Sequence, residues 1–154
     1  MEWLGLAFDG HLMGVLAVKI GAAYLLALPI GWEREQAQHS VGLRTFPLVA
    51  VAACGYVLLA DTAAGSDAAA RSRIIQGLTT GIGFIGGAAI MRGRTNVHGT
   101  ATAASIWNTG VIGASIAEGH FEIALILSLL NLVTLRLLAP LKERADRAPQ
   151  KGQK

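Results

Sequence analysis

Charged residues of both signs stand at the boundary between the first two apolar stretches of the chain. Glu33 and Arg34 lie in the run IGWERE, and Arg44 and Thr45 follow shortly after it in the run GLRT. Charges at membrane depth are costly unless they are paired, and they mark functional sites there. We therefore predict that Glu33, Arg34 and Arg44 form one paired, partly buried cluster. The alternative is a solvated loop at the membrane–water interface.

A second polar group lies between two runs of small residues. Arg92 and Asn96 belong to it, and Trp107 and Asn108 follow within the next apolar stretch. The indole N–H of Trp107 needs a hydrogen-bond partner in apolar surroundings, and so does the carboxamide of Asn108. We therefore expect Trp107 to face the interior of the protein and Asn108 to avoid the lipid.

The chain shows no constellation of residues that fits catalysis, a cofactor or a metal. The run GIGFIG matches the dinucleotide fingerprint G-x-G-x-x-G, but no Asp or Glu occurs between Asp67 and Glu118 to bind a ribose. The four histidines are scattered, without the i, i+4 spacing of a zinc site, and the single cysteine, Cys54, lies in an apolar run. We expect neither an enzyme nor a protein with a cofactor or a metal site.

The composition indicates a membrane protein. Of the 154 residues, 53% are hydrophobic and 15% are charged, whereas about a quarter of the residues in a soluble domain are charged. The net charge is +3, but the basic residues stand between apolar stretches and in the last residues of the chain rather than on one face. This distribution is typical of topology signals and argues against a nucleic-acid-binding protein.

Five stretches are apolar enough to be membrane spans, because a bilayer core about 30 Å thick needs about 20 apolar residues in a helix. All five should be helices, since irregular backbone that faces lipid leaves amides unpaired. The sequence thus predicts an all-α bundle of five transmembrane helices within residues 1–141, followed by a basic, disordered tail at 142–154. The predicted spans are residues 12–31, 46–60, 74–91, 100–117 and 123–141.

The basic residues also predict the orientation. Outside the spans, Arg71 and Arg73 fall on one side of the membrane, and all the other Lys and Arg residues fall on the opposite side. By the positive-inside rule the N-terminus is outside and the C-terminus is cytoplasmic. Two basic residues lie within spans. We expect Arg136 to reach the nearby interface, whereas Lys19 either does the same or has a role inside the bundle.

Residues 74–117 are dense in Gly, Ala, Ser and Thr, which allow helix backbones to approach closely in lipid. We predict that this segment is a tight transmembrane hairpin around which the other spans are arranged. The small-xxx-small spacing leaves open whether the contacts lie within one chain or across a homo-oligomer. The glycines predicted to pack are Gly77, Gly81, Gly83, Gly86 and Gly87.

Two stretches resemble the MgtC/SapB family of bacterial inner-membrane proteins. The runs IGWERE and GLRT are similar to the family patterns IGxERE and AGLRT, and GIGFIGGAAIM and TAASIW resemble GIGFLGAGVIM and the end of VRGLTTAASLW. They occur in the same order and at the same spacing as in the family. The resemblance implies a functional polar cluster that consists of Glu33, Arg34, Arg44, Thr45, Arg92, Asn96 and Trp107.

The resemblance also implies a biological setting. Longer members of this family carry a C-terminal, ACT-like cytoplasmic domain, and by comparison we interpret this chain as a short form. The longer members are associated with adaptation to low magnesium, with survival inside host cells and with restraint of the F-type ATP synthase. The family has no settled biochemical activity.

Two classes of function fit these observations. In the first, the protein is a regulator or adaptor that lies among membrane lipids, forms a homo-oligomer and binds another membrane complex through its small-residue face. In the second, it is a carrier or channel for a small ion or solute. The polar path of such a carrier would be lined by Glu33, Arg34, Arg44, Asn96, Asn108 and Trp107.

Overall fold

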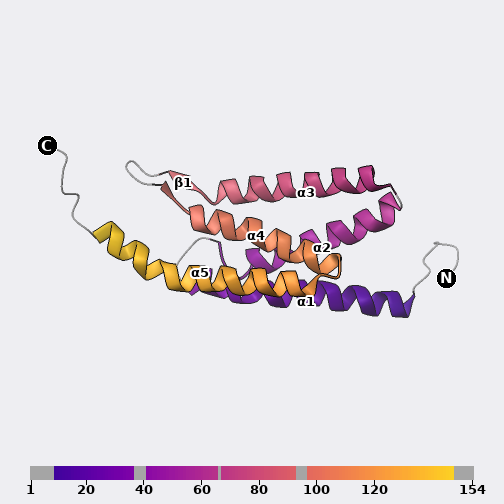
Figure 1. Cartoon of the computed structure of the whole chain (residues 1–154), viewed down its shortest axis with the longest axis horizontal. Helices are drawn as coiled ribbons and strands as arrows, with labels where there is room; N and C mark the ends of the chain where they lie inside the picture. Colours follow the sequence, from indigo (N-terminus) through magenta and orange to yellow (C-terminus); the bar gives the residue numbers. More distant parts are fainter. Residues whose placement is uncertain (1–8, 37–40, 66, 93–96, 148–154) are drawn as a thin grey trace.

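The computed structural model of the chain describes residues 9–36, 41–65, 67–92 and 97–147, and confirms an all-α fold. Two short antiparallel strands, β1 (Met91–Arg92) and β2 (Val97–His98), join α3 to α4. Successive helices run in opposite directions, so the start of α1 and the end of α5 lie at opposite ends of the bundle (Figure 1). The helices are α1 (Gly10–Gln36), α2 (Thr45–Ala64), α3 (Ala68–Ala88), α4 (Thr100–Ala117) and α5 (Phe121–Arg147).

Each helix lies where an apolar stretch predicted one, but several helices are longer than the stretch. The helix α4 has the predicted bounds, whereas α1 continues to Gln36 and therefore includes the whole run IGWERE. The helix α5 continues to Arg147, so the first part of the predicted tail is helical and the rest lies outside the described residues. Charged Glu, Arg and Lys residues have good helix propensity, so a helix need not end where its apolar run ends.

Within the described part of the chain, α1, α2 and the segment Phe121–Leu138 of α5 are long and apolar enough to cross a membrane, judged by length and composition. The other two helices carry more small and polar residues. Their assignment as spans stays a prediction, and so does the orientation of the bundle. A helix that is covered by other helices needs less apolar surface, and this applies to α4.

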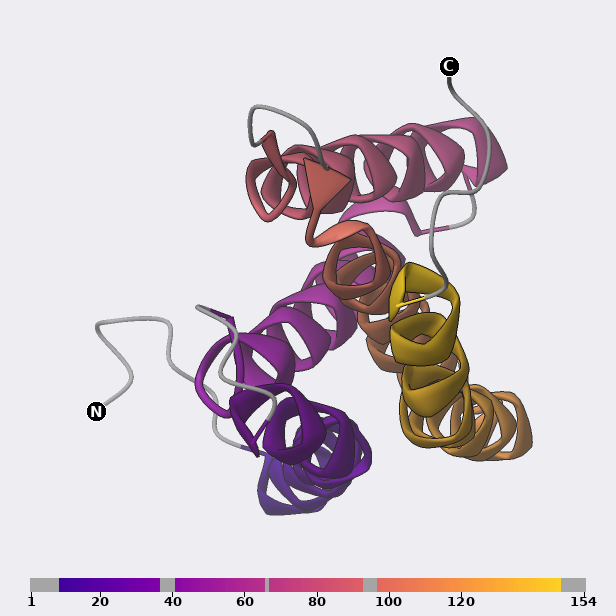
Figure 2. The same cartoon turned by 90° about the vertical axis from the view of Figure 1, so that its left-hand side faces the viewer.

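The helix α4 lies at the centre of the bundle and packs against α1, α2, α3 and α5. Its most extensive contact is with α2, and the two helices bury Ile106, Ile112 and Ile116 together with Phe46 and other residues of α2. Figure 2, which looks along the bundle, shows α4 surrounded by the other helices. Cys54 of α2 is buried in the same core, as a small hydrophobic residue would be.

The helix α3 lies at one side of the bundle, across from α1 and α5 (Figure 2). It packs mainly against α2 and α4, and among its residues Ile82 and Gly86 are buried. The prediction that α3 and α4 form the tight centre of the protein is therefore wrong in part. The centre is the pair α2 and α4, and α3 covers one flank of that pair while most of its own surface stays exposed.

Candidate functional site

The end of α1 fits closely against the segment that leads into α2. A Cβ atom on Gly31 would stand 3.1 Å from the Cα atom of Leu43, so the segment passes directly over the helix at this glycine. The backbone N–H of Leu43 donates to Oε2 of Glu35 at 3.1 Å. Glycine at position 31 and a carboxylate at position 35 thus fix the start of α2 relative to the end of α1.

Glu33 binds a helix that is distant in the sequence. Nε of Arg136 on α5 donates to Oε2 of Glu33 at 2.7 Å, and the Glu33 side chain is 17% exposed whereas that of Arg136 is 56% exposed. The pair ties α1 to α5 at the end of the bundle that we predict to be cytoplasmic. Arg136 was expected only to extend toward the interface, and its role as the partner of Glu33 was missed because the two residues are far apart in the chain.

The predicted cluster of Glu33, Arg34 and Arg44 comes together only in part. Arg34 is 6% exposed, and its Nε atom has no hydrogen-bond partner among the residues that the structure describes. Arg44 is exposed and lies with half-buried Thr45 at the end of a groove between α2 and α3. All of these residues lie at one end of the bundle, but the described ion pair of Glu33 is with Arg136 and with neither of the other two arginines.

The second polar group is less fully described. Arg92 lies in β1, nothing is described of its side chain, and Asn96 lies outside the described residues. Trp107 is 48% exposed, so the prediction that it faces the interior is wrong. Its side chain lies on an exposed side of α4, whereas the side chain of the preceding residue, Ile106, is fully buried. Asn108 is half-buried and donates to the carbonyl of Leu127 at 3.2 Å, consistent with the expectation that it avoids the lipid.

Polar side chains join α5 to its neighbours inside the bundle. Oγ of Ser105 donates to Oδ1 of Asn131 at 2.9 Å, and Oγ of Ser128 donates to the carbonyl of Leu26 at 2.6 Å. A small hollow of about 280 Å³ lies beside the first of these contacts, between α4 and α5. We did not single out Asn131 or Ser128 from the sequence, although an amide or hydroxyl within an apolar span is itself a sign of a contact between helices.

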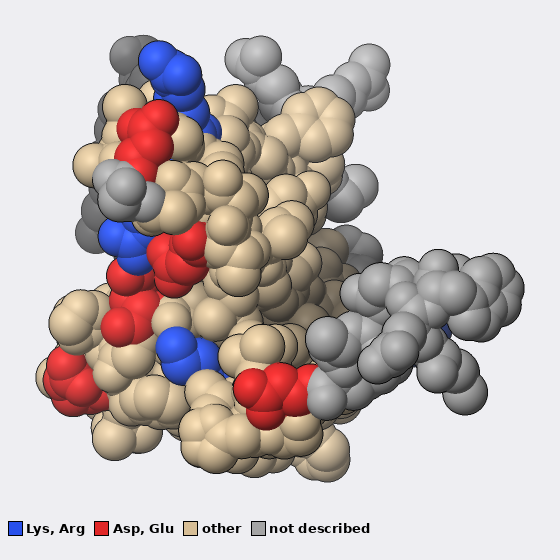
Figure 3. Space-filling view, turned by 90° about the vertical axis from the view of Figure 1, so that its right-hand side faces the viewer, with Lys and Arg blue, Asp and Glu red and all other residues tan. Residues whose placement is uncertain are grey.

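An ion-pair cluster closes the opposite end of the bundle. Arg71 at the start of α3 bonds Asp61 at the end of α2 at 2.7 Å, and it also bonds Glu118 just after α4. Figure 3 shows acidic and basic side chains gathered on this end. The hydrogen bond that Arg71 donates to Glu118, followed by the one that it donates to Asp61, raises the pKa of Arg71 above its ordinary value. The cluster connects α2 and α3 to the end of α4.

Lys19 was expected either to reach the interface or to have a role inside the bundle, and its side chain binds the end of a neighbouring helix, where the predicted span 100–117 ends. Its Nζ atom donates to the carbonyl of Ala117, the last residue of α4, at 2.6 Å. A positive charge at the C-terminal end of a helix satisfies a free carbonyl and opposes the negative end of the helix dipole.

Replacing Lys19 is therefore expected to loosen the contact between α1 and α4. Lys19→Met should lower the stability of the protein by about 1–2 kcal/mol, because the carbonyl of Ala117 loses a charged donor. Lys19→Gln, which keeps a donor but no charge, should lose less. Thermal unfolding in detergent measures both variants, and equal melting temperatures for Lys19→Met and the wild type would refute the role.

Four of the five glycines predicted to pack have open space around them within the chain. A Cβ atom on Gly77, Gly81, Gly83 or Gly87 would meet nothing within 4 Å. On Gly86, a Cβ atom would stand 3.2 Å from the carbonyl oxygen of Ala103, so this glycine does allow α3 to approach α4. Close packing elsewhere uses glycines of α4 instead: Gly110 lies against Ile82, and Gly113 lies against the backbone of Ala50.

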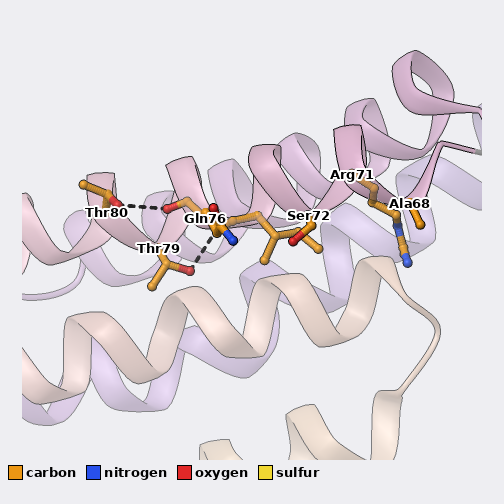
Figure 4. Close-up of a pocket in the computed structure, with 7 residues that line it drawn as sticks. Ala68, Arg71, Ser72, Gln76, Thr79 and Thr80 are labelled. Atoms are coloured by element: carbon orange, nitrogen blue, oxygen red, sulfur yellow. Dashed lines mark hydrogen bonds between the residues drawn. The ribbon is translucent and has the colours of Figure 1, made fainter.

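The outer face of α3 carries a stripe of small and polar residues, which we call the α3 stripe. Its members recur every three or four positions and therefore share one side of the helix. A pocket of about 610 Å³ runs along part of this side, and Figure 4 shows the side chains that line it. The stripe consists of Ser72, Gln76, Thr79, Thr80, Gly83 and Gly87, all exposed.

Among the residues that the structure describes, no group of three or more His, Cys, Asp or Glu side chains is placed to hold a metal ion. Several of the described polar side chains bond a second helix, among them Lys19, Ser105 and Ser128, whereas no described bond joins the α3 stripe to another helix.

Comparison with known proteins agrees with the resemblance seen in the sequence. The MgtC family profile matches residues 20–144. The chain is 35% identical to Protein SrpB of Synechococcus elongatus, over 87% of this chain and 75% of that protein. It is 36% identical to Protein MgtC of Salmonella typhimurium over 90% of this chain and 58% of that protein, and 32% identical to Protein MgtC of Brucella abortus over 81% and 52%.

The chain thus spans little more than half the length of its relatives named MgtC, and about three quarters of SrpB. No solved structure matches it. The match covers all five helices in whole or in part, including the runs at the end of α1, the start of α2 and the end of α3. This protein is a helical membrane protein that belongs to the MgtC family.

Proposed function

We propose that this protein is a regulator or adaptor in the bacterial inner membrane, and that it acts by binding a transmembrane helix of another protein through the α3 stripe. The observation that carries the proposal is the stripe itself, a row of small and polar side chains left exposed on a helix at the side of the bundle. The family link to low-magnesium adaptation suggests the growth condition under which to look for the partner.

Among the polar members of the stripe, Gln76 is unsuited to lipid, whereas the two threonines are satisfied within α3. The hydroxyls of Thr79 and Thr80 donate to carbonyls of their own helix, at 2.9 Å each (Figure 4). No described residue bonds the carboxamide of Gln76, which is exposed. An amide without a partner in a hydrocarbon environment costs several kcal/mol. A second helix that packs on the stripe would supply a partner for Gln76.

The small members of the stripe leave room for that helix. Gly83 and Gly87 lie on the same side as Gln76, and a Cβ atom on either would meet nothing within the chain. Small residues at this spacing let two backbones approach closely, and this contact together with polar bonds between helices is what holds membrane helices together. On this one surface, Gln76 can form a hydrogen bond with a partner helix, and the glycines allow the backbone of that helix to come close.

A carrier function has less support from the arrangement of the side chains. Arg44 lines the groove between α2 and α3, Asn108 lines the hollow between α4 and α5, and Trp107 lies on the outer side of α4. These residues were expected along a single path, and in the described part of the chain they open onto different surfaces. We therefore favour the adaptor.

A photo-crosslinking residue in place of Thr80 tests the proposal in native membranes. We expect it to form an adduct with another membrane protein, whereas the same residue in place of Leu25 should not, because Leu25 is also exposed but lies on α1. An additional adduct with a second copy would agree with the predicted homo-oligomer. Adducts with a second copy alone, or none at Thr80, would contradict the adaptor, as would solute flux in liposomes that contain only this protein.

Gly83→Leu is expected to separate binding from folding. The added side chain meets nothing within the chain, so the melting temperature in detergent should change little, because a substitution at such a site shifts stability by about 0.5 kcal/mol or less. Recovery of the partner from native membranes should fall sharply, because the leucine holds the two helices apart. A matched variant, Gly14→Leu, adds the same side chain to an open site on α1 and should retain the partner.

A further inference from the structure

A second surface of α3 faces in a different direction from the α3 stripe. It forms one wall of a groove of about 750 Å³, and α2 forms the other wall. From their shared turn, α2 and α3 diverge toward the end of the bundle where α2 begins (Figures 1 and 2). The lining of the groove is almost entirely apolar along its length, with Leu48, Ala52 and Tyr56 on α2 and Ile74 and Ile85 on α3.

The groove is hollow because small residues line it. Gly77 and Gly81 lie in its wall, and a Cβ atom on either would meet nothing within 4 Å. Larger side chains at these positions would occupy the space between the two helices. The small residues thus leave the apolar groove open on the side of a protein that lies in lipid.

One end of the groove is charged. Arg44, the residue before α2, is exposed and belongs to the lining, and none of the described lining residues carries a carboxylate. The hydroxyl-bearing side chain of Thr45 stands next to it in the same lining. An arginine guanidinium binds phosphate oxygens through paired hydrogen bonds, and it is suited to this role at a membrane–water boundary.

The length of the groove fits one leaflet of a bilayer. From Arg44 to Tyr56 the helix rises by about 18 Å, at about 1.5 Å per residue. Half of a hydrocarbon core that is about 30 Å thick measures about 15 Å. An acyl chain that follows the groove would therefore place its headgroup near Arg44 when its end is near Tyr56.

We propose that the groove between α2 and α3 binds one anionic phospholipid, with an acyl chain between the helices and the phosphate at Arg44. Basic pockets between membrane helices bind anionic headgroups by the same combination of charge and apolar surface. A helix of a protein is the competing occupant. It would have to cover Arg44 and separate its charge from water, which is costly without a partner carboxylate. The proposal depends on the membrane location and is independent of the α3 stripe.

Native mass spectrometry of the full chain in mild detergent tests this proposal. With equal amounts of phosphatidylglycerol and phosphatidylcholine, the wild type should bind one phosphatidylglycerol with a preference of about fivefold, the factor expected for one basic group. Arg44→Gln should remove the preference. Arg73→Gln, at an exposed arginine outside the groove, should leave it unchanged.

A second variant tests the apolar part of the site. Gly81→Phe fills the groove and should reduce the binding of both lipids about tenfold, whereas Gly14→Phe, at an open glycine on α1, should not. Equal lipid binding by Gly81→Phe and the wild type would overturn the proposal, as would an unchanged preference in Arg44→Gln. A photo-crosslinking residue in place of Tyr56 should capture lipid in native membranes, and capture of a polypeptide there would show that a helix occupies the groove instead.

Discussion

Gly113→Ala is expected to destabilise the protein by about 3 kcal/mol, near the upper end for overpacking in a well-packed core. A Cβ atom at this position of α4 would stand 2.9 Å from the carbonyl carbon of Ala50 and 3.1 Å from its Cα atom. The colliding atoms belong to the backbone of α2, so no side chain can rotate away, and the two helices at the centre of the bundle must separate. Thermal unfolding of the purified protein in detergent measures the loss.

Gly55→Ala is the matched control for this substitution. Gly55 lies on α2, and a Cβ atom there would meet nothing within 4 Å. Alanine is a better helix former than glycine by about 1 kcal/mol, so this variant should be as stable as the wild type or slightly more stable. Similar melting temperatures for Gly113→Ala and Gly55→Ala would show that α2 and α4 are not packed against each other in this way.

Reversing the charge of Glu33 is expected to destabilise the protein less than Gly113→Ala does. Glu33→Arg places two positive charges where the carboxylate now accepts a hydrogen bond from Arg136, and it should cost about 1–2 kcal/mol. The value is lower than for a buried pair because more than half of the Arg136 side chain is exposed to solvent, which screens the interaction. Melting temperatures of the single variants and of the double variant form a thermodynamic cycle.

The double variant, Glu33→Arg combined with Arg136→Glu, should recover much of the lost stability. Pairing of the exchanged charges restores the link between α1 and α5, and coupling energies of residues in contact are typically about 0.5–3 kcal/mol. If the two single losses simply add in the double variant, the two residues do not interact, and α1 and α5 are held together by their apolar contacts alone.

Hydrophobic stretches were enough to predict the five helices, because length and apolar composition determine which segments can lie in a membrane. The same apolar stretches did not predict the residues at which the helices end. The run IGWERE stands where the first predicted span ends, yet it forms the last turns of α1, and α5 continues beyond the end of the fifth predicted span, to Arg147. The loss of hydrophobicity marks where a helix leaves the lipid rather than where its hydrogen bonds stop.

Which residues face one another was harder to predict. Trp107 and Ile106 are both apolar and adjacent, and only the packing of α4 against α2 decides that Ile106 is inside. The partner of Glu33 is on the last helix, and no local pattern indicates a contact between positions so distant in the chain. The glycine-rich α3 looked like the centre of the bundle because small residues favour close packing, but the same residues on an outer surface favour contact with a different molecule.

The central position of α4 has a consequence for how the protein is made. This helix is less apolar than α1, α2 and α5, and it contacts all four other helices, of which only α5 is synthesised after it. A segment of such low hydrophobicity gains little free energy if it moves from the insertion machinery into lipid without another helix beside it. It is therefore expected to enter the membrane together with α5, against the surface that the first three helices have already formed.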